Sequence, residues 1–429
     1  MQKLMRKCGV DGSGLDGSRG SPITRTAHDN AAIAFVTMAA FALYLTTSFV
    51  LQTREATALF GADTGLYVWL AHGNASDRVT RFHPLTTTLI TGWMRVFSPL
   101  GTWIAPEQIL KGLMAAVGTL GVWAAMGAFS ALVPRRFVPW LGAIYATSLG
   151  CWYFSSIAES KIISATLATL YIATYCRLRA DWTHARAACL TGVLLLACLN
   201  EIVAGLLVVV PVVDALYERG INLRRDGWIL PHALVVLVAL AFLEFVVNGR
   251  IAGASDDPEQ ASHVSMLLFY LADNDFDWTT TTTFLSNWLL FNIAAPAKLA
   301  THAFPQWPNY RGFFPPGLGN YLTSPWGWGL ALMFGMVVLT SLFTLRGNES
   351  VRMAKGLLLG LLAYAVLRGG FFYVFDPNEC LLFSTSVTLA HMVLIGLPFV
   401  TSRIPCKSVI IGLGTTLLFV NNAIFMFGL

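Results

Sequence analysis

The chain has 429 residues, of which 55% are hydrophobic and only 12% are charged, and its net charge is +5. Because an ordinary soluble domain carries about 25% charged residues, this composition excludes a water-soluble globular protein and favours one embedded in a membrane. The apolar residues come in continuous blocks of about 20 residues, the length of a membrane-spanning helix, rather than in the alternating pattern of a membrane β-barrel.

The N-terminal segment is polar. Residues 1–29 are rich in glycine and serine and include five basic residues. This segment is too long and too polar to be the basic flank of a signal peptide. We therefore expect a disordered cytoplasmic tail at 1–29, followed by an uncleaved first span and a transmembrane domain over 30–429.

The predicted fold is all-α, with about eleven membrane-spanning helices. Nine apolar blocks are each long enough for one span: 31–52, 108–132, 137–157, 162–177, 228–248, 328–346, 356–375, 384–401 and 408–427. The block 187–217 is too long for one span and is interrupted by Asn200-Glu201, so we expect two short helices that meet near one face. The stretch 85–104 is broken by Arg95, Ser98-Pro99 and Gly101, and it is predicted to lie flat on the membrane surface.

The basic residues decide the orientation of these helices. With the N-terminus in the cytoplasm and 85–104 on the outer surface, 18 of the 28 Lys and Arg residues lie in inner segments, and 15 of the 23 acidic residues lie outside or at outer span ends. The opposite arrangement places Arg135-Arg136 and most later basic loops outside, against the positive-inside rule. Two large outer segments follow, 53–107 and 249–327, and the aromatic-rich second one is expected to form interfacial helices and loops.

Candidate catalytic groups gather in the first outer segment. Asp63, in GADTGLYVWL, could act as a general base or help to hold a divalent cation. The alternative is a loop aspartate that caps a short helix beginning after Thr64. Arg81 and His83-Pro84 precede the surface helix, where an imidazole could meet a phosphate or a sugar; the alternative is an interfacial histidine before a helix-starting proline.

A second set of ionisable residues lies at the outer ends of spans. Glu159 and Glu201 flank or interrupt apolar blocks, and a carboxylate at that depth requires a partner or a polar cavity. Lys111 could neutralise a lipid phosphate or extend to the interface. Arg368 is predicted within the outer half of a span, where a phosphate or carboxylate partner is expected. Glu379 opens the outer end of the tenth span.

The sequence gives little support for a metal site, a disulfide framework or a hydrolase active site. The run Asp273, Asp275 and Asp277 could bind a metal, but the adjacent threonines favour a solvated loop. The seven cysteines show no CxxC spacing, so we expect neither a zinc site nor a disulfide framework. A nucleotide-binding glycine loop, HExxH and GxSxG are all missing from the sequence, which therefore gives no sign of ATP hydrolysis, zinc proteolysis or serine hydrolysis.

The order of these features resembles the GT-C superfamily of membrane glycosyltransferases, which includes protein O-mannosyltransferases, the aminoarabinose transferase of lipid A and oligosaccharyltransferase catalytic subunits. The likeness covers the first 250 residues best. It comprises Asp63 followed by Tyr67, the surface helix after His83-Pro84-Leu85, Lys111 at the start of a span, a basic inner turn, and a second outer acid, Glu159. The early loop holds a single aspartate rather than an acidic pair, which leaves metal dependence open.

The resemblance implies a sugar transferase that uses a polyprenyl-phosphate donor and inverts the configuration at C1. Asp63 would be the base, Glu159 the second acid, and His83, Lys111 and Arg368 would bind the donor phosphate. Tyr67, Arg81, Glu201 and Glu379 complete the set of substrate-binding candidates. The acceptor would be a lipid, a polysaccharide or a protein, with no nucleic-acid partner. The site would face the periplasm from a bacterial inner membrane, or the lumen from an endoplasmic reticulum membrane.

Two alternatives stay open at this stage. A transporter or flippase of a lipid-linked saccharide needs polar groups through the membrane, and Asp214 and Glu244 are the carboxylates that could serve it. The clustering of most ionisable residues at one end of the predicted spans argues against this function. A non-catalytic membrane assembly subunit with the same fold is the other alternative.

Overall fold

A computed structural model describes residues 22–52, 64–74, 83–180, 183–219, 227–242, 276–297, 301–304, 307–313, 316–344, 351, 354–375, 377 and 380–428. Apart from one hairpin, the regular elements there are helical. The α-helices are α2 (Pro22–Gln52), α3 (Thr64–Ala71), α5 (Pro84–Phe97), α6 (Pro106–Leu132), α7 (Val138–Thr147), α8 (Leu149–Ser156), α9 (Lys161–Ala180), α10 (His184–Asn200), α11 (Val209–Arg219), α13 (Ile229–Ala241), α16 (Trp278–Leu290), α17 (Pro325–Thr344), α19 (Lys355–Phe375), α20 (Cys380–Ser384), α21 (Thr388–Thr401) and α22 (Lys407–Gly428). Short 3-10 helices are η2 (Ser98–Thr102), η3 (Arg135–Phe137), η4 (Ile202–Val208), η8 (Leu318–Tyr321) and η9 (Thr385–Val387).

The fold is helical, as predicted, with the addition of one short β-hairpin among the described residues. Strand β1 (Thr301–Phe304) pairs antiparallel with β2 (Trp307–Phe313), and Thr301 lies opposite Phe313. The hairpin lies in the predicted outer segment 249–327, where we expected interfacial helices and loops.

The chain is a helical, multi-pass membrane protein. Within the described residues, six segments are long and apolar enough to cross a bilayer: Asn30–Leu51, Pro106–Leu132, Pro325–Thr344, Lys355–Phe375, Leu381–Thr401 and Lys407–Gly428. Each coincides with a predicted span. His184–Asn200, Ile202–Tyr217 and Ile229–Ala239 are shorter apolar helices that also fall in predicted spans.

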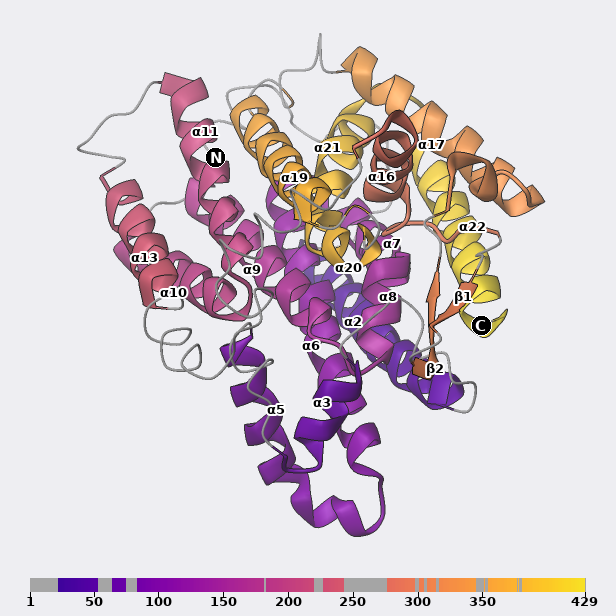
Figure 1. The fold of residues 1–429 in the computed structure, drawn as a ribbon. Helices are drawn as coiled ribbons and strands as arrows, with labels where there is room; N and C mark the ends of the chain where they lie inside the picture. Colours follow the sequence, from indigo (N-terminus) through magenta and orange to yellow (C-terminus); the bar gives the residue numbers. More distant parts are fainter. Residues whose placement is uncertain are drawn as a thin grey trace.

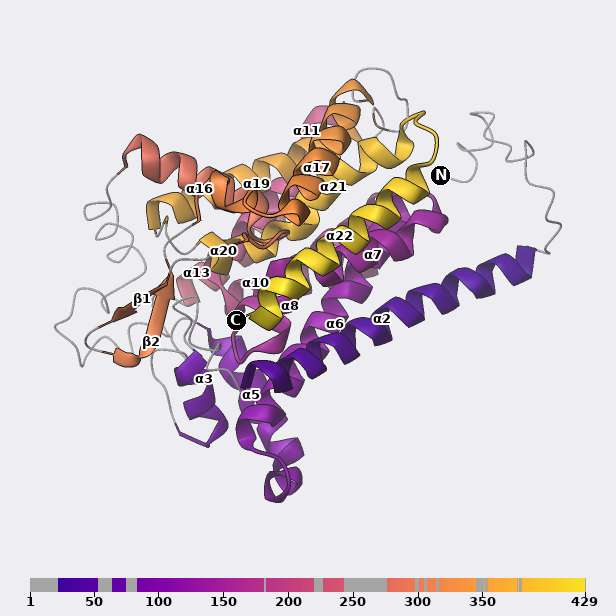
Figure 2. The same cartoon turned by 90° about the vertical axis from the view of Figure 1, so that its right-hand side faces the viewer.

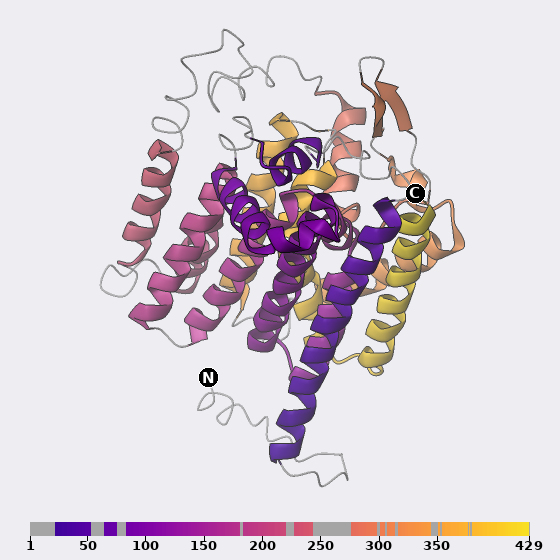
Figure 3. The ribbon, with the colours of Figure 1, turned by 90° about the horizontal axis from the view of Figure 1, so that it is seen from below.

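The long helices lie side by side, and α3 and α5 project from one end of the bundle (Figure 1). The hairpin and the C-terminal end of α22 lie toward that same end, whereas α2 begins at the opposite end (Figures 2 and 3). Helix α2 starts at Pro22, before the first predicted span, in a segment predicted to be disordered. A proline in the first turn suits a helix start, because its fixed φ is helical and its missing N–H is not needed there.

The stretch 85–104 does not form a long helix. It divides into α5 and η2 at Ser98-Pro99, and on α5 only Thr86 and Ile90 are fully buried. Helix α5 packs against α3, α6 and α10. The following Trp103 is 87% exposed, which suits the aromatic belt of a membrane interface.

Two apolar blocks contain a break. The block 187–217 divides at Glu201 into α10 and η4–α11, which confirms the expected pair of short helices. The block 137–157, predicted as one continuous span, instead breaks at Ser148 into α7 and α8. The first N–H groups of α8, at Leu149 and Gly150, donate to carbonyl oxygens of a distant turn, Ile293 at 3.0 Å and Asn292 at 2.9 Å.

The turn after α16 is anchored inside the bundle. The side-chain nitrogen of Asn422 donates to the carbonyl oxygens of Thr147 and Ile293, both at 2.8 Å, and its oxygen accepts from the N–H of Ala295 at 2.8 Å. Asn292 donates to the carbonyl oxygen of Ser384 at 3.1 Å. Part of the second predicted outer segment is therefore tied to α7, α20 and α22 rather than lying only on the surface.

Candidate functional site

The structure describes six of the nine predicted site residues: Tyr67, His83, Lys111, Glu159, Glu201 and Arg368. Asp63, Arg81 and Glu379 lie outside the described residues, as does Glu244. We call Glu159, Lys161, Glu201 and Arg368 the polar cluster: the first three lie in or beside breaks between apolar helices, and Arg368 lies within α19 and pairs with Glu201.

Glu159 lies in the turn between α8 and α9. Its carboxylate is 1% exposed, and its Oε1 accepts from the backbone N–H of Ser160 at 2.9 Å and from the Ser160 hydroxyl at 3.2 Å. The hydroxyl of Tyr67, on α3, donates to the same Ser160 hydroxyl at 2.7 Å. Two predicted site residues 92 positions apart are thus joined through a serine that the sequence did not single out.

Asn200 connects the surface helix to the bundle at the end of α10. Its side-chain oxygen accepts from Thr86 at 2.6 Å, and its side-chain nitrogen donates to Ser164, on α9, at 2.7 Å. The backbone oxygen of Asn200 lies 2.6 Å from Nδ1 of His83. His83 therefore anchors the start of α5 to the residue beside Glu201.

Arg368 and Glu201 form a buried ion pair. Nη2 of Arg368 lies 2.8 Å and 2.9 Å from the two carboxylate oxygens of Glu201, and the two residues are 1% and 7% exposed. The sequence predicts a phosphate or carboxylate partner for Arg368, and the partner in the structure is the carboxylate of Glu201 in the same chain. Glu201 lies in the break between α10 and η4; burial alone would raise the pKa of its carboxyl, but Arg368 and Lys161 lower that pKa to about 2.

Lys161 is the member of the cluster that was not among the predicted site residues. It is the first residue of α9, it is half-buried, and its Nζ lies 4.7 Å from the ring centre of Phe383. Its charge also acts on Glu201. Among the described residues, no carboxylate forms an ion pair with its ammonium. Its position directly after Glu159-Ser160 was the available signal in the sequence.

The surroundings of Lys111 differ from those that a phosphate-binding lysine needs. Its side chain is fully buried on α6, and its Nζ lies 2.8 Å from Oε1 of Glu107, one turn earlier. A buried ammonium requires such a counter-charge. Lys111 therefore neither extends to the interface nor carries an unbalanced charge.

Other acidic residues have structural partners. Asp277 caps the N-terminus of α16 by accepting from the N–H of Thr280 at 2.6 Å. Asp214 accepts from the hydroxyl of Tyr175 at 2.6 Å and from Nε of Arg179 at 2.7 Å. In the described part of the chain, no group of three or more His, Cys, Asp or Glu residues could hold a metal ion.

No protein-family model matches the chain, and a search of curated protein sequences finds no match. The polar cluster is the feature of this chain that points to a function.

Proposed function

We propose that this chain is a membrane glycosyltransferase with a GT-C-like arrangement of about eleven spans. It would move a sugar from a polyprenyl-phosphate donor to an acceptor at the outer, periplasmic face. The observation that carries the proposal is the polar cluster, in which two carboxylates and two cations are collected from α9, α19 and the ends of α8 and α10. Ionisable residues are costly inside an apolar bundle, and they commonly mark a site for a polar substrate.

The acidic half of the cluster suits the acceptor. In the proposed step, an acceptor oxygen attacks C1 of the sugar, the bond from C1 to the phosphate oxygen breaks, and polyprenyl phosphate leaves with the electron pair. Asp63 takes the acceptor's proton. Glu159, whose orientation is fixed by the amide and hydroxyl of Ser160, would position the acceptor, together with Tyr67.

The cationic half suits the donor phosphate. Lys161 is the best candidate to contact it, because its ammonium has no carboxylate partner among the described residues and lies close enough to Glu201 to affect its pKa. The charge of Arg368 is balanced by Glu201, and that of Lys111 is balanced by Glu107. These two cations would therefore stabilise the surrounding structure and act on the phosphate only at longer range. His83 anchors the start of α5 to Asn200, next to Glu201, and Arg81 and Glu379 stay candidates for substrate binding.

The test is transfer from a radiolabelled polyprenyl-phosphate sugar by purified protein in lipid vesicles. Replacing a general base typically costs about 100-fold or more, so Asp63→Asn should lower turnover by at least that factor. Lys161→Met should weaken donor binding, so the KM for the donor should rise. Asp277→Asn is a matched control, because that carboxylate caps α16.

One result would contradict the proposed function, and another would contradict the assignment of the base. Wild-type protein that releases no sugar from any such donor, but moves the lipid between leaflets, would be a flippase. Asp63→Asn protein with wild-type turnover would remove the assigned base while leaving the transferase function in place.

A further inference from the structure

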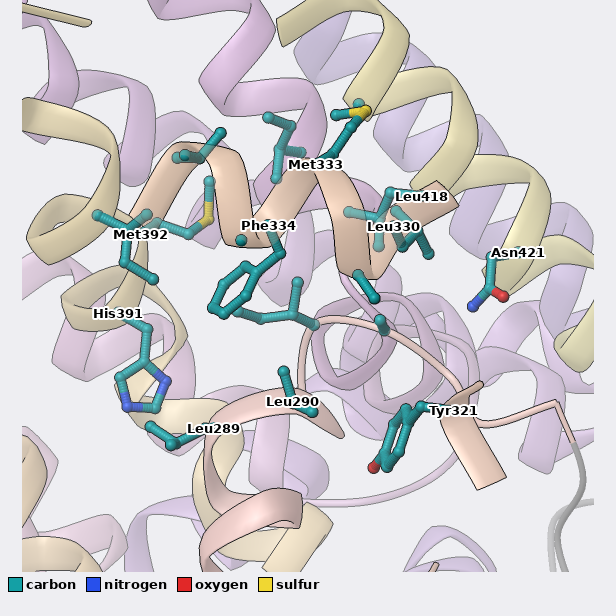
Figure 4. Close-up of a pocket in the computed structure, with 18 of the residues that line it drawn as sticks. Leu289, Leu290, Tyr321, Leu330, Met333, Phe334, His391, Met392, Leu418 and Asn421 are labelled. Atoms are coloured by element: carbon teal, nitrogen blue, oxygen red, sulfur yellow. The ribbon is translucent and has the colours of Figure 1, made fainter. Parts of the chain in front are cut away.

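Two apolar cavities lie in the C-terminal half of the bundle. The large cavity, of about 680 Å³, is lined mainly by α16, α17, α21 and α22 (Figure 4). The small cavity, of about 470 Å³, lies between α16, α19 and α21. Both volumes are typical of ligand sites, which span about 300–1,000 Å³. No member of the polar cluster lines either cavity.

The two cavities adjoin one another. Five residues line both of them: Leu285, Leu289, Phe334, His391 and Ile395. Four of these are apolar, and the fifth is a histidine. Figure 4 shows the ring of His391 beside Leu289, on the side of the large cavity toward which Phe334 also extends.

His391 has an unmet hydrogen-bonding requirement. The residue is 5% exposed, and its Nδ1 is buried without a hydrogen-bond partner among the described residues. An imidazole offers one donor and one acceptor when neutral, and a buried polar atom without a partner is destabilising. A ligand that supplies a polar atom at this point would remove that cost.

The large cavity is polar at one end only. Its polar lining residues are Ser286, Tyr321, His391 and Asn421, which come from α16, η8, the first turn of α21 and the last third of α22. At the other end, where α21 finishes and α22 begins, the lining is Phe399, Val400, Ile410 and Ile411. From Ile410 to Asn421 the lining follows α22 for about 16 Å, at about 1.5 Å per residue. Ser286, Tyr321 and Asn421 already hydrogen-bond within the protein, so His391 is the lining residue whose buried polar atom lacks a partner among the described residues. This arrangement suits an amphiphile whose chain lies along the helices and whose polar group lies at His391.

We propose that the two cavities hold the two hydrocarbon chains of a diacyl lipid from the bilayer, and that an ester carbonyl of this lipid accepts a hydrogen bond from His391. Two apolar cavities that meet at one polar side chain match a lipid with two chains and an ester group near their junction. A polyprenyl phosphate has one chain and no carbonyl, so it fits only half of this arrangement. Helix α17, which lines the large cavity, also exposes Leu332, Leu339 and Phe343, and these side chains would face the lipid of a bilayer. The site is independent of the proposed sugar transfer.

Photo-crosslinking tests this lipid site. The protein would be placed in nanodiscs that contain an ester-linked diacyl phospholipid with a diazirine on each chain, and labelled peptides would be mapped by mass spectrometry. We expect labels on α17, α21 and α22 from one chain and on α19 from the other. Gly335 lines the large cavity and Gly370 lines the small one, and a Cβ at either position meets no atom within 4 Å, so a leucine has room to occupy part of each cavity. Gly335→Leu and Gly370→Leu should each lower labelling of the cavity they fill by about tenfold.

Gly192→Leu is the matched control, because this exposed glycine on α10 also has open space at its Cβ and lines neither cavity.

The role of His391 is tested by competition with an ether-linked diacyl lipid, which lacks the carbonyl. Wild type should prefer the ester lipid by about fivefold, the value of one neutral hydrogen bond, and His391→Leu should lose this preference. Labels spread evenly over the lipid-facing helices, or unchanged by both cavity-filling variants, would overturn the proposal. Displacement of the diacyl probe by a polyprenyl phosphate at equal concentration would also overturn it. None of these readouts depends on transfer activity.

Discussion

Arg368 and Glu201 stabilise the protein only as a pair. Because both are buried, removal of one partner leaves an uncompensated charge, whereas removal of both also removes the desolvation cost.

The contribution of this ion pair to the stability of the protein depends on pH. Its contribution is complete above about pH 4.3, the usual pKa of a glutamate, and it is lost as the pH falls toward the pKa of about 2 that Glu201 has in the folded state.

Glu201→Leu should therefore destabilise the protein by about 3–5 kcal/mol, and the double variant Glu201→Leu, Arg368→Met should recover much of that loss. Thermal unfolding in detergent, compared across wild type, Glu201→Leu, Arg368→Met and the double variant, gives the coupling between the two residues. Additive losses in the double variant would contradict a mutual role. Transfer activity should be lost in all three, because the polar cluster is altered even where stability returns.

Glycine allows α11 and α19 to approach closely. A Cβ at Gly360 would lie 2.5 Å from the carbonyl oxygen of Val210 and 3.0 Å from its Cα, and a Cβ at Gly356 would meet Asp214. These contacts are with backbone or with a side chain already held by Tyr175 and Arg179, so they cannot move aside easily. The packing of α11 on α19 positions Arg368 opposite Glu201, which precedes η4 and α11.

Gly360→Ala should consequently destabilise the protein by about 1–3 kcal/mol, the usual cost of overpacking. Gly112→Ala is the control, since its Cβ meets no atom within 4 Å, and it should be neutral or slightly stabilising. Both variants can be compared by thermal unfolding in the same detergent. Equal behaviour of the two would show that the α11–α19 contact is not tight.

Local sequence signals predicted one helix break and missed the other. Asn200-Glu201 interrupts an apolar block with polar residues, so the break between α10 and η4 follows from the sequence. The break at Ser148 depends on Asn292 and Ile293, which are more than 140 positions away, and hydropathy cannot detect them. The candidate site was likewise predictable from local signals and not from distant contacts. Glu159, Glu201 and Arg368 stand out as ionisable residues in apolar surroundings, but their partners are set by tertiary packing.

At the scale of the whole molecule, the helix bundle has two unlike ends. The start of α2 lies at one end, and α5 with the C-terminal end of α22 lies at the other (Figure 3). Asn200, the residue before Glu201, joins the end of α10 to His83 at the start of α5 and to Ser164 in the first turn of α9, on the side from which α5 projects. The positive-inside rule predicts that this end faces outward, because basic residues such as Arg403 and Lys407 flank the opposite turn.

Cysteine accessibility tests this orientation directly. Cys406 is exposed in the turn between α21 and α22, and Trp103 is exposed after α5 on the predicted outer side. In chains whose other cysteines are replaced by serine or alanine, Trp103→Cys should react with a membrane-impermeant maleimide on intact cells, because the predicted orientation places residue 103 on the outer side. Cys406 alone should react only after permeabilisation, and Cys151 alone, which is buried, should react in neither case. Reaction of Cys406 on intact cells would reverse the orientation and place the polar cluster on the cytoplasmic side. A periplasmic polyprenyl-phosphate sugar could not reach it there, and the proposed transfer would fail for a reason independent of Asp63.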